Sequence, residues 1–146
     1  MSASPVADTS IRCVSFALAG ERFGVDVLRV REVLPLPAIT SVPGAPSSCL
    51  GVLNLRGRIL SVLDTRALLG LATAAPGPSA HLLVVESAGR WLGLVIDAIG
   101  EVLALPEAST DDRDAAGHAS AAVRLCHHER GYVGLLTLPI LLEELA

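Results

Sequence analysis

The residues of this sequence that could bind a metal gather near its C-terminal end. Cys126, His127, His128 and Glu129 follow one another there, and His118 lies shortly before them. Thiolate and imidazole are ligands that zinc prefers. The surrounding aliphatic residues predict a β-strand, however, and neighbouring residues of a strand point to opposite faces. Cys126, His127 and His128 therefore cannot all converge on one ion, and we predict no metal site.

The cysteines likewise offer no chemistry. They number three and are widely separated, at Cys13, Cys49 and Cys126. An odd number without close spacing indicates reduced, buried thiols of a cytosolic protein rather than a disulfide framework. No histidine or aspartate pattern accompanies them that would activate a nucleophile. We therefore predict no catalytic residue. A small β-barrel enzyme or ligand-binding protein remains the alternative class, although the apolar strands carry few polar residues inward.

A charged turn is the more informative feature. Within residues 51–64, two apolar runs are joined through Arg56 and Gly57, which predicts a β-hairpin with an arginine at its tip. Gly57 can take a positive φ, and Arg56 is not easily buried. The arginine is either a solvated turn residue or a contact for a partner. Asp64 closes the second run and is expected to cap a helix at 65–71.

Composition excludes several partners. The chain has 146 residues, a net charge of −4, and arginine but no lysine. Phosphate neutralisation needs a basic face, so nucleic acid is not expected to be a partner. No uncharged apolar run reaches the ~18 residues that a membrane span needs. The N-terminus lacks a signal sequence, so we expect a cytoplasmic protein that does not insert into membranes.

The sequence contains an internal repeat. Residues 23–37 align without gaps on residues 92–106, with six identities that include Gly24 on Gly93, Glu32 on Glu101 and Pro37 on Pro106. Aliphatic strands resemble one another by chance, but the placed glycine, glutamate and proline are not explained in that way. The hairpin tip at 56–57 also matches Arg130-Gly131 further on.

The repeat and the short strands between turns predict an all-β fold of two pseudo-symmetric barrels. We expect strands and a few short helical segments, the strands at 11–18, 23–25, 33–36, within 51–64, and at 81–85, 91–96, 99–105, 119–126 and 132–138. Helical turns are expected after Asp26, after Asp64, and at 140–145 after Pro139. Residues 1–10 are expected to be a flexible N-terminus, and 11–146 a single domain. Its two subdomains are approximately 11–75 and 79–146, with the termini able to cross between barrels, and the seam between them is the expected binding groove.

Three motifs resemble the CheW family of chemotaxis adaptor proteins. They are Glu21-Arg22-Phe23-Gly24-Val25-Asp26-Val27 with Val30 and Glu32, then Gly51-Val52-Leu53-Asn54-Leu55-Arg56-Gly57 with Val62 and Asp64, and Gly93-Leu94-Val95-Ile96-Asp97 with Val102. The resemblance covers about 12–145. It implies two five-stranded SH3-like β-barrels with a short C-terminal helix, no catalysis and no cofactor.

The resemblance also implies two partners and the residues that bind them. Glu32, Asn54 and Arg56 match the receptor-binding positions, and the receptor is the tip of a chemoreceptor cytoplasmic hairpin. Val30 and Gly51 match positions linked to the regulatory domain of a CheA-type histidine kinase. The implied function is a scaffold that links chemoreceptors to this kinase in a signalling array. Ser61 and Thr65 depart from the family pattern, so an accessory adaptor that binds receptor without kinase is the alternative.

Overall fold

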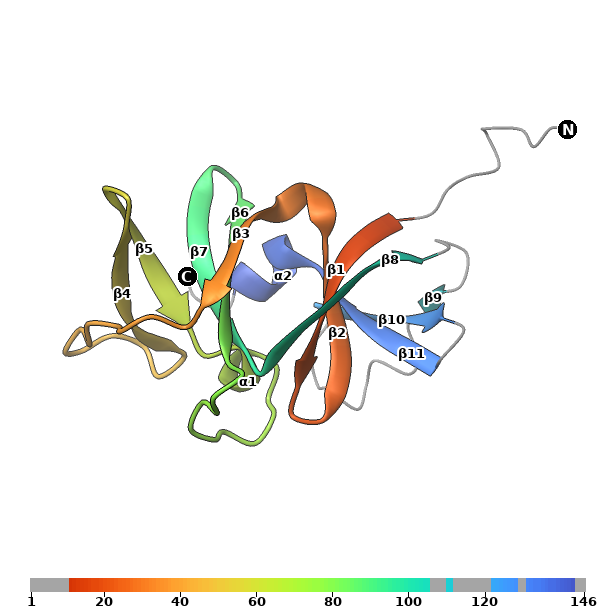
Figure 1. Cartoon of the computed structure of the whole chain (residues 1–146), viewed down its shortest axis with the longest axis horizontal. Coiled ribbons are helices and arrows are strands. Elements are labelled where there is room, and N and C mark those ends of the chain that lie inside the picture. The colour runs from red at the N-terminus through yellow and green to blue at the C-terminus, as the bar shows by residue number, and fades with distance from the viewer. Residues whose placement is uncertain (1–10, 106–109, 112–121, 129–130, 144–146) are drawn as a thin grey trace, which may run out of the picture.

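The structure is a computed structural model that describes residues 11–105, 110–111, 122–128 and 131–143, and it is built mainly of β-strands (Figure 1). The strands are β1 (Ile11–Leu18), β2 (Glu21–Asp26), β3 (Val30–Pro35), β4 (Cys49–Leu55), β5 (Arg58–Leu63), β6 (His81–Ser87), β7 (Arg90–Ile96), β8 (Ala98–Leu105), β9 (Thr110–Asp111), β10 (Val123–His128) and β11 (Gly131–Leu136). The helical segments are the 3-10 turn η2 (Val27–Arg29), α1 (Thr65–Leu68) and α2 (Leu138–Glu143).

The strands form two sheets, each the wall of one small barrel. The first has the order β8-β1-β2-β11-β10-β9 and is called barrel A; β9 adds only two residues to its edge. The second has the order β3-β6-β7-β5-β4 and is called barrel B. The expected all-β fold of two barrels with a short C-terminal helix is confirmed.

The barrels do not coincide with the two halves of the sequence. Barrel A combines β1 and β2 with β8, β10 and β11, whereas barrel B combines β3, β4 and β5 with β6 and β7. The division of subdomains at 75–79 is therefore not the division between barrels. The repeated segments explain why: in the first copy the chain leaves barrel A after β2 to form β3, and in the second it leaves barrel B after β7 to form β8. The two copies exchange strands reciprocally.

The registers show the same symmetry and correct one detail of the repeat. The parallel pair of β11 with β2 begins at Gly134 and Phe23, and that of β5 with β7 begins at Ser61 and Leu92. In the hairpins, Leu55 pairs with Arg58, and His128 pairs with Gly131. Gly131 therefore opens β11 and corresponds to Arg58, so aligning it with Gly57 was wrong by one residue.

Three apolar clusters make the core. One fills barrel A around Cys13, Leu103 and Val133, and one fills barrel B around Leu60, Val62 and Leu82. The largest lies between the barrels and includes buried residues of β1, β2, β6, β7, α1 and α2. Figure 1 shows α2 between the two barrels. The seam is thus a packed core and not an open groove, and a partner can reach only its margins.

The short helical segments begin where capping residues place them. The Asp26 side chain accepts a hydrogen bond from the Leu28 amide at 2.9 Å, and the Asp64 side chain accepts one from the Ala67 amide at 3.3 Å. Both predicted caps are confirmed. The last helix begins at Leu138, one residue before Pro139, whose fixed φ suits a first turn.

Some predicted segments fall at or beyond the edge of the described residues. Residues 1–10 and 119–121 lie outside them, as does most of the polar loop after Pro106, of which only 110–111 are seen, in β9. Within the described part of the chain, the helices are all too short to cross a membrane.

Candidate functional site

Arg56 and Glu32, which are far apart in the sequence, form a two-pronged ion pair. The distance from Arg56 Nη1 to Glu32 Oε1 is 2.5 Å, and that from Arg56 Nη2 to Glu32 Oε2 is 2.6 Å. The Arg56 side chain is 70% exposed and that of Glu32 is 25% exposed. The two parallel hydrogen bonds fix the direction of the guanidinium, as in other bidentate arginine–carboxylate pairs. The site is therefore a surface feature with a defined orientation.

Asn54 holds the turn that carries Arg56. Arg56 has φ = 52° and Gly57 has φ = 86°, which together are typical of the tight two-residue turn that suits twisted hairpins. The Asn54 side-chain oxygen accepts a hydrogen bond from the Gly57 amide at 2.8 Å. A positive φ is unfavourable for arginine, so the hairpin and the ion pair must hold it there. Asn54 thus acts on Arg56 through the turn.

The ion pair joins the two edges of the barrel B sheet. Glu32 lies on β3, which is one edge strand, and Arg56 lies in the turn after β4, which is the other. The pairing lowers the pKa of Glu32, first because the carboxylate accepts hydrogen bonds from Arg56 and then because of the guanidinium charge. The same contacts raise the pKa of Arg56. Both groups are held in their charged forms.

The repeat offers a comparison for Glu32. Glu101 is its counterpart on β8, which is the corresponding edge strand of barrel A. Its backbone carbonyl accepts a hydrogen bond from Ser15 Oγ at 2.6 Å, but its carboxylate makes no ion pair within the described residues. Of these two equivalent glutamates, only Glu32 therefore has a carboxylate that forms an ion pair within the described residues.

Val30 and Gly51 lie on the same two edge strands but have packing roles. Val30 begins β3 and packs partly against the seam core, at a bulge that precedes Glu32. Gly51 is buried on β4 with φ = 153°, and an added Cβ would overlap the Thr40 carbonyl oxygen and lie 2.8 Å from Ile39 Cγ2. Thr40 in turn exchanges two backbone hydrogen bonds with Val52, of 3.0 and 2.8 Å. The five predicted site residues therefore lie on, or directly after, the two edge strands of barrel B, but only Glu32, Asn54 and Arg56 form a bonded cluster.

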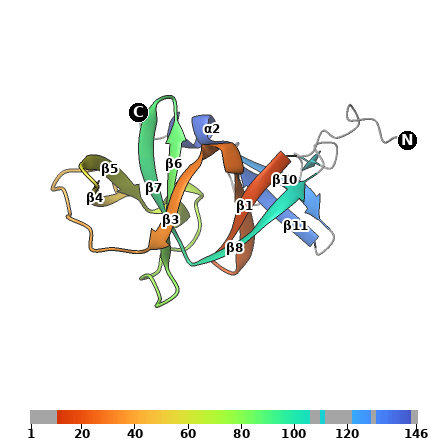
Figure 2. The same ribbon diagram turned by 45° about the horizontal axis from the view of Figure 1, so that its top comes forward.

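The sequence did not reveal a set of exposed apolar side chains near the crossovers, where the chain passes from one barrel to the other between β2 and β3 and between β7 and β8. Leu28 in η2 is 74% exposed, and Ile99 and Val102 on β8 are 39% and 51% exposed. Figure 2 shows β3 and β8 on the same side of the molecule, one in each barrel. The sequence analysis places Leu28 in a helical turn and Ile99 and Val102 in a strand, and it makes no prediction of their exposure. The internal repeat does not predict this exposure either, because Val30 and Val33, which align with Ile99 and Val102, are partly buried.

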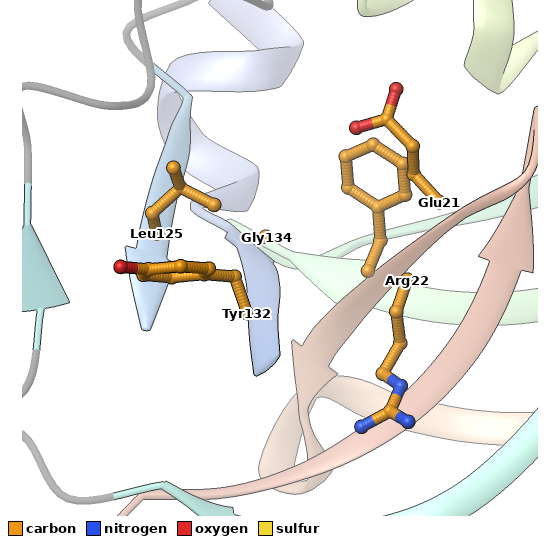
Figure 3. A pocket seen from close by; sticks show the side chains of 6 residues that line it. Glu21, Arg22, Leu125, Tyr132 and Gly134 are labelled. Carbon is orange, nitrogen blue, oxygen red and sulfur yellow. The ribbon is translucent and has the colours of Figure 1, made fainter. Parts of the chain in front are cut away.

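A hollow of about 210 Å³ opens where β2 and β11 diverge beyond their short parallel contact. It is lined by Glu21, Arg22, Phe23, Leu125, Tyr132 and Gly134. In Figure 3 the Leu125 and Tyr132 side chains lie across from Glu21 and Arg22. The lining contains no histidine, serine or cysteine, so the hollow offers no nucleophile and base in contact. A separate contact lies in barrel B, where the Arg58 guanidinium carbon stacks 4.0 Å from the centre of the Trp91 ring.

Cys126 and His127 alternate between buried and exposed as the strand pattern predicted, but Cys49 is only partly buried, so the expectation of buried thiols is wrong for that residue. Cys126 is buried inside barrel A, whereas His127 is exposed and its ring lies 4.4 Å from that of Tyr132. Over the described ranges, no group of three potential ligands comes together that could hold a metal ion. Cys13, Cys49 and Cys126 are free thiols. His118 and Glu129 lie outside the described residues.

The fold and the site together define a class of protein: a pseudo-symmetric double β-barrel with an oriented ion pair at the edge of one barrel and apolar side chains at the edge of the other. The chain belongs to the CheW-like domain family, because the profile of that domain matches residues 12–145. The expected family is thereby confirmed.

Comparisons with individual proteins agree. The chain is 34% identical to the chemotaxis protein CheW of Rhizobium meliloti over 101 residues, which cover 69% of this chain and 62% of that protein. It is 31% identical to a probable chemotaxis protein CheW of Rhizobium etli over 106 residues, which cover 67% of this chain and 68% of that protein. The crystal structure of the scaffolding protein TtCheW from Thermoanaerobacter tengcongensis has a TM-score of 0.81 and 26% identity, and the match covers 92% of this chain and 94% of that one. The match to the first of these relatives spans about three fifths of its length.

Proposed function

We propose that this protein is a non-enzymatic adaptor of a chemosensory array, which holds a chemoreceptor and a CheA-type histidine kinase at a fixed distance in the cytoplasm. The observation that carries this proposal is the match of nearly the whole chain to the CheW-like domain, together with the fold of a protein described as a scaffold. A rigid body with two binding surfaces lets a change in the receptor bias the kinase.

The receptor surface of this proposal is the cluster of Glu32, Asn54 and Arg56 together with exposed apolar side chains of β8. A receptor hairpin tip is helical, and helices dock through apolar side chains into complementary surfaces. Ile99 and Val102 on β8 are exposed and supply such side chains. Arg56 presents most of its side chain to solvent while Glu32 fixes the direction of the guanidinium, so it can anchor a polar group of the helix at little entropic cost.

The kinase surface includes Val30 and Gly51, on the edge strands of barrel B. Their packing suggests that Gly51 acts by shaping the backbone of β4 against residues 39–40, since a glycine offers no side chain for contact. Val30 stays partly exposed and is the direct apolar contact.

The test is retention of the full chain on a chemoreceptor cytoplasmic fragment and on the regulatory domain of a CheA-type kinase. Arg56→Glu should lose receptor binding, because it reverses the anchoring charge and repels Glu32. The matched control is Arg90→Glu, which makes the same charge change at an exposed position of barrel B outside the cluster.

The outcomes separate the alternatives. Retention of wild type on both baits, with loss on the receptor bait for Arg56→Glu alone, supports the proposal. Retention on the receptor bait only identifies an accessory adaptor without a kinase contact. Equal retention of wild type and Arg56→Glu removes Arg56 from the receptor surface, and failure of wild type on both baits refutes the adaptor function.

A further inference from the structure

Asp97, between β7 and β8, joins three segments of the chain through one carboxylate. Its Oδ2 atom accepts a hydrogen bond from the Ala19 amide at 2.9 Å and from Arg66 Nη2 at 2.6 Å. Its own amide donates to the Ala17 carbonyl at 3.0 Å. Arg66 also donates from Nη1 to the Ala72 carbonyl at 3.0 Å. The pair is largely shielded, with the Arg66 side chain 18% exposed and that of Asp97 34% exposed.

These contacts connect the two barrels. Ala19 lies in the turn between β1 and β2 of barrel A, and Arg66 lies in α1, which follows β5 of barrel B. Asp97 sits at the crossover where the chain passes from barrel B to barrel A. We call Asp97, Arg66 and Ala19 the crossover clamp.

Among the residues that the structure describes, the crossover from β2 to β3 has no equivalent clamp. The repeat aligns Leu28 with Asp97, and the Leu28 side chain is 74% exposed. The polar contacts of Leu28 are local: its amide donates to the Asp26 side chain, and its carbonyl accepts a hydrogen bond from Arg31 Nη1 at 3.5 Å. The pseudo-symmetry of the fold therefore does not require a carboxylate at this place, and barrel packing alone does not explain Asp97.

Asp97 immediately precedes β8, whose exposed residues include Ile99 and Val102. The apolar core between the barrels resists their separation, but apolar contacts are non-directional and restrain a small rotation only weakly. Hydrogen bonds depend steeply on angle and distance and can fix such a rotation.

We propose that Asp97 is a positioning residue that, through Arg66 and Ala19, sets the angle between the barrels and with it the orientation of β8 relative to Glu32 on β3. This inference rests on the proposed function, because it assigns β8 and β3 to one receptor surface. The crossover at Asp97 is held by the clamp, whereas the crossover at Leu28 is not held in this way. The two barrels are therefore fixed relative to each other on the Asp97 side of the seam.

The test uses the full chain with Asp97→Asn, and Arg66→Gln as a second variant in case the first does not fold. Residual dipolar couplings of the backbone amides report the relative orientation of the barrels without any partner. One alignment tensor should fit both barrels of wild type. Asp97→Asn should need a different barrel orientation, with about ten-fold faster hydrogen exchange of the Ala19 amide because its charged acceptor is lost.

Receptor binding is the second measurement. Asp97→Asn should weaken binding of the receptor fragment by about five-fold or more, the lower range of coupling between distant sites. The matched control is Asp64→Asn, which makes the same chemical change at the cap of α1; because asparagine also caps helices, we expect Arg66 to keep its place. Thermal unfolding of each variant shows whether a weaker complex follows from barrel orientation or from lost stability.

A folded Asp97→Asn with wild-type couplings and wild-type exchange at Ala19 overturns the inference, and so does a loss of affinity that Asp64→Asn matches. If neither Asp97→Asn nor Arg66→Gln folds, the clamp is a requirement for folding and not a positioning device, which overturns it as well. If wild type does not bind the receptor fragment, the proposed function fails, while the dipolar couplings still decide whether Asp97 sets the barrel angle.

Discussion

Replacing Gly51 by alanine is expected to destabilise the protein through the backbone of barrel B. Gly51 has φ = 153°, and its Cβ would overlap the Thr40 carbonyl oxygen. To relieve the overlap, residues 39–40 must move away from β4, which breaks the two backbone hydrogen bonds between Thr40 and Val52. These bonds contribute roughly 1 kcal/mol each. A residue with a side chain at this φ costs a further ~1–3 kcal/mol.

The sum is a loss of about 3–5 kcal/mol, a large part of the stability of a single domain. For a chain of this length it corresponds to a decrease in Tm of roughly 10 °C. Circular dichroism during heating measures the decrease, and urea unfolding gives the free energy independently. Gly77→Ala is the matched control, since nothing lies within 4 Å of its added Cβ, and it should shift the free energy of unfolding by less than about 0.5 kcal/mol.

The same variant tests the proposed role of Gly51 in kinase binding. If Gly51→Ala weakens binding of the kinase regulatory domain in proportion to its loss of stability, the glycine acts by holding the edge of barrel B. A folded Gly51→Ala with the Tm of wild type would refute the packing argument, because the overlap with Thr40 would then be relieved without cost.

Two further predictions concern titration. Arg56 lowers the pKa of Glu32, so the ion pair stabilises the folded state above pH 4.5, the ordinary pKa of glutamate, and this stabilisation is lost as the pH falls through the lowered pKa of the folded state. Glu32→Gln should therefore flatten the acidic part of a plot of Tm against pH. An unchanged acidic part would contradict the pairing. Burial, and then the nearby charge of Cys126, raise the pKa of Cys13 to about 11. At pH 8, iodoacetamide should therefore modify the half-buried Cys49 before Cys13, which peptide mass mapping measures. Early labelling of Cys13 would contradict its burial.

Local features of the fold could be read from the sequence because short-range chemistry decides them. Asp26 and Asp64 are good helix caps wherever they precede an apolar turn, and the structure uses both in that way. The turn at Arg56-Gly57 follows from a glycine between two apolar runs. The repeat was visible partly because both copies keep a glycine, Gly24 and Gly93, where an added Cβ would lie 2.7 Å from a neighbouring side chain.

The pairing of strands could not be read from the sequence. Strands β1, β6 and β7 are apolar on both faces because one face lines a barrel and the other lines the seam, as Leu82 and Leu83 do on β6. Such a pattern predicts burial but not a partner, so it did not reveal that β11 pairs with β2 and β5 with β7. The symmetry of the repeat also predicted a binding groove at the seam, where the structure has a packed core.

The sequence by itself determined the class of fold, the symmetry of its two copies and the arginine at the tip of one hairpin. Tertiary structure alone decided that Arg56 meets Glu32, that Gly51 lies against Thr40, and that Asp97 joins the barrels. The physical reason is range: caps and turns are set by residues a few positions apart, whereas these contacts depend on how strands are exchanged between two barrels around a shared core.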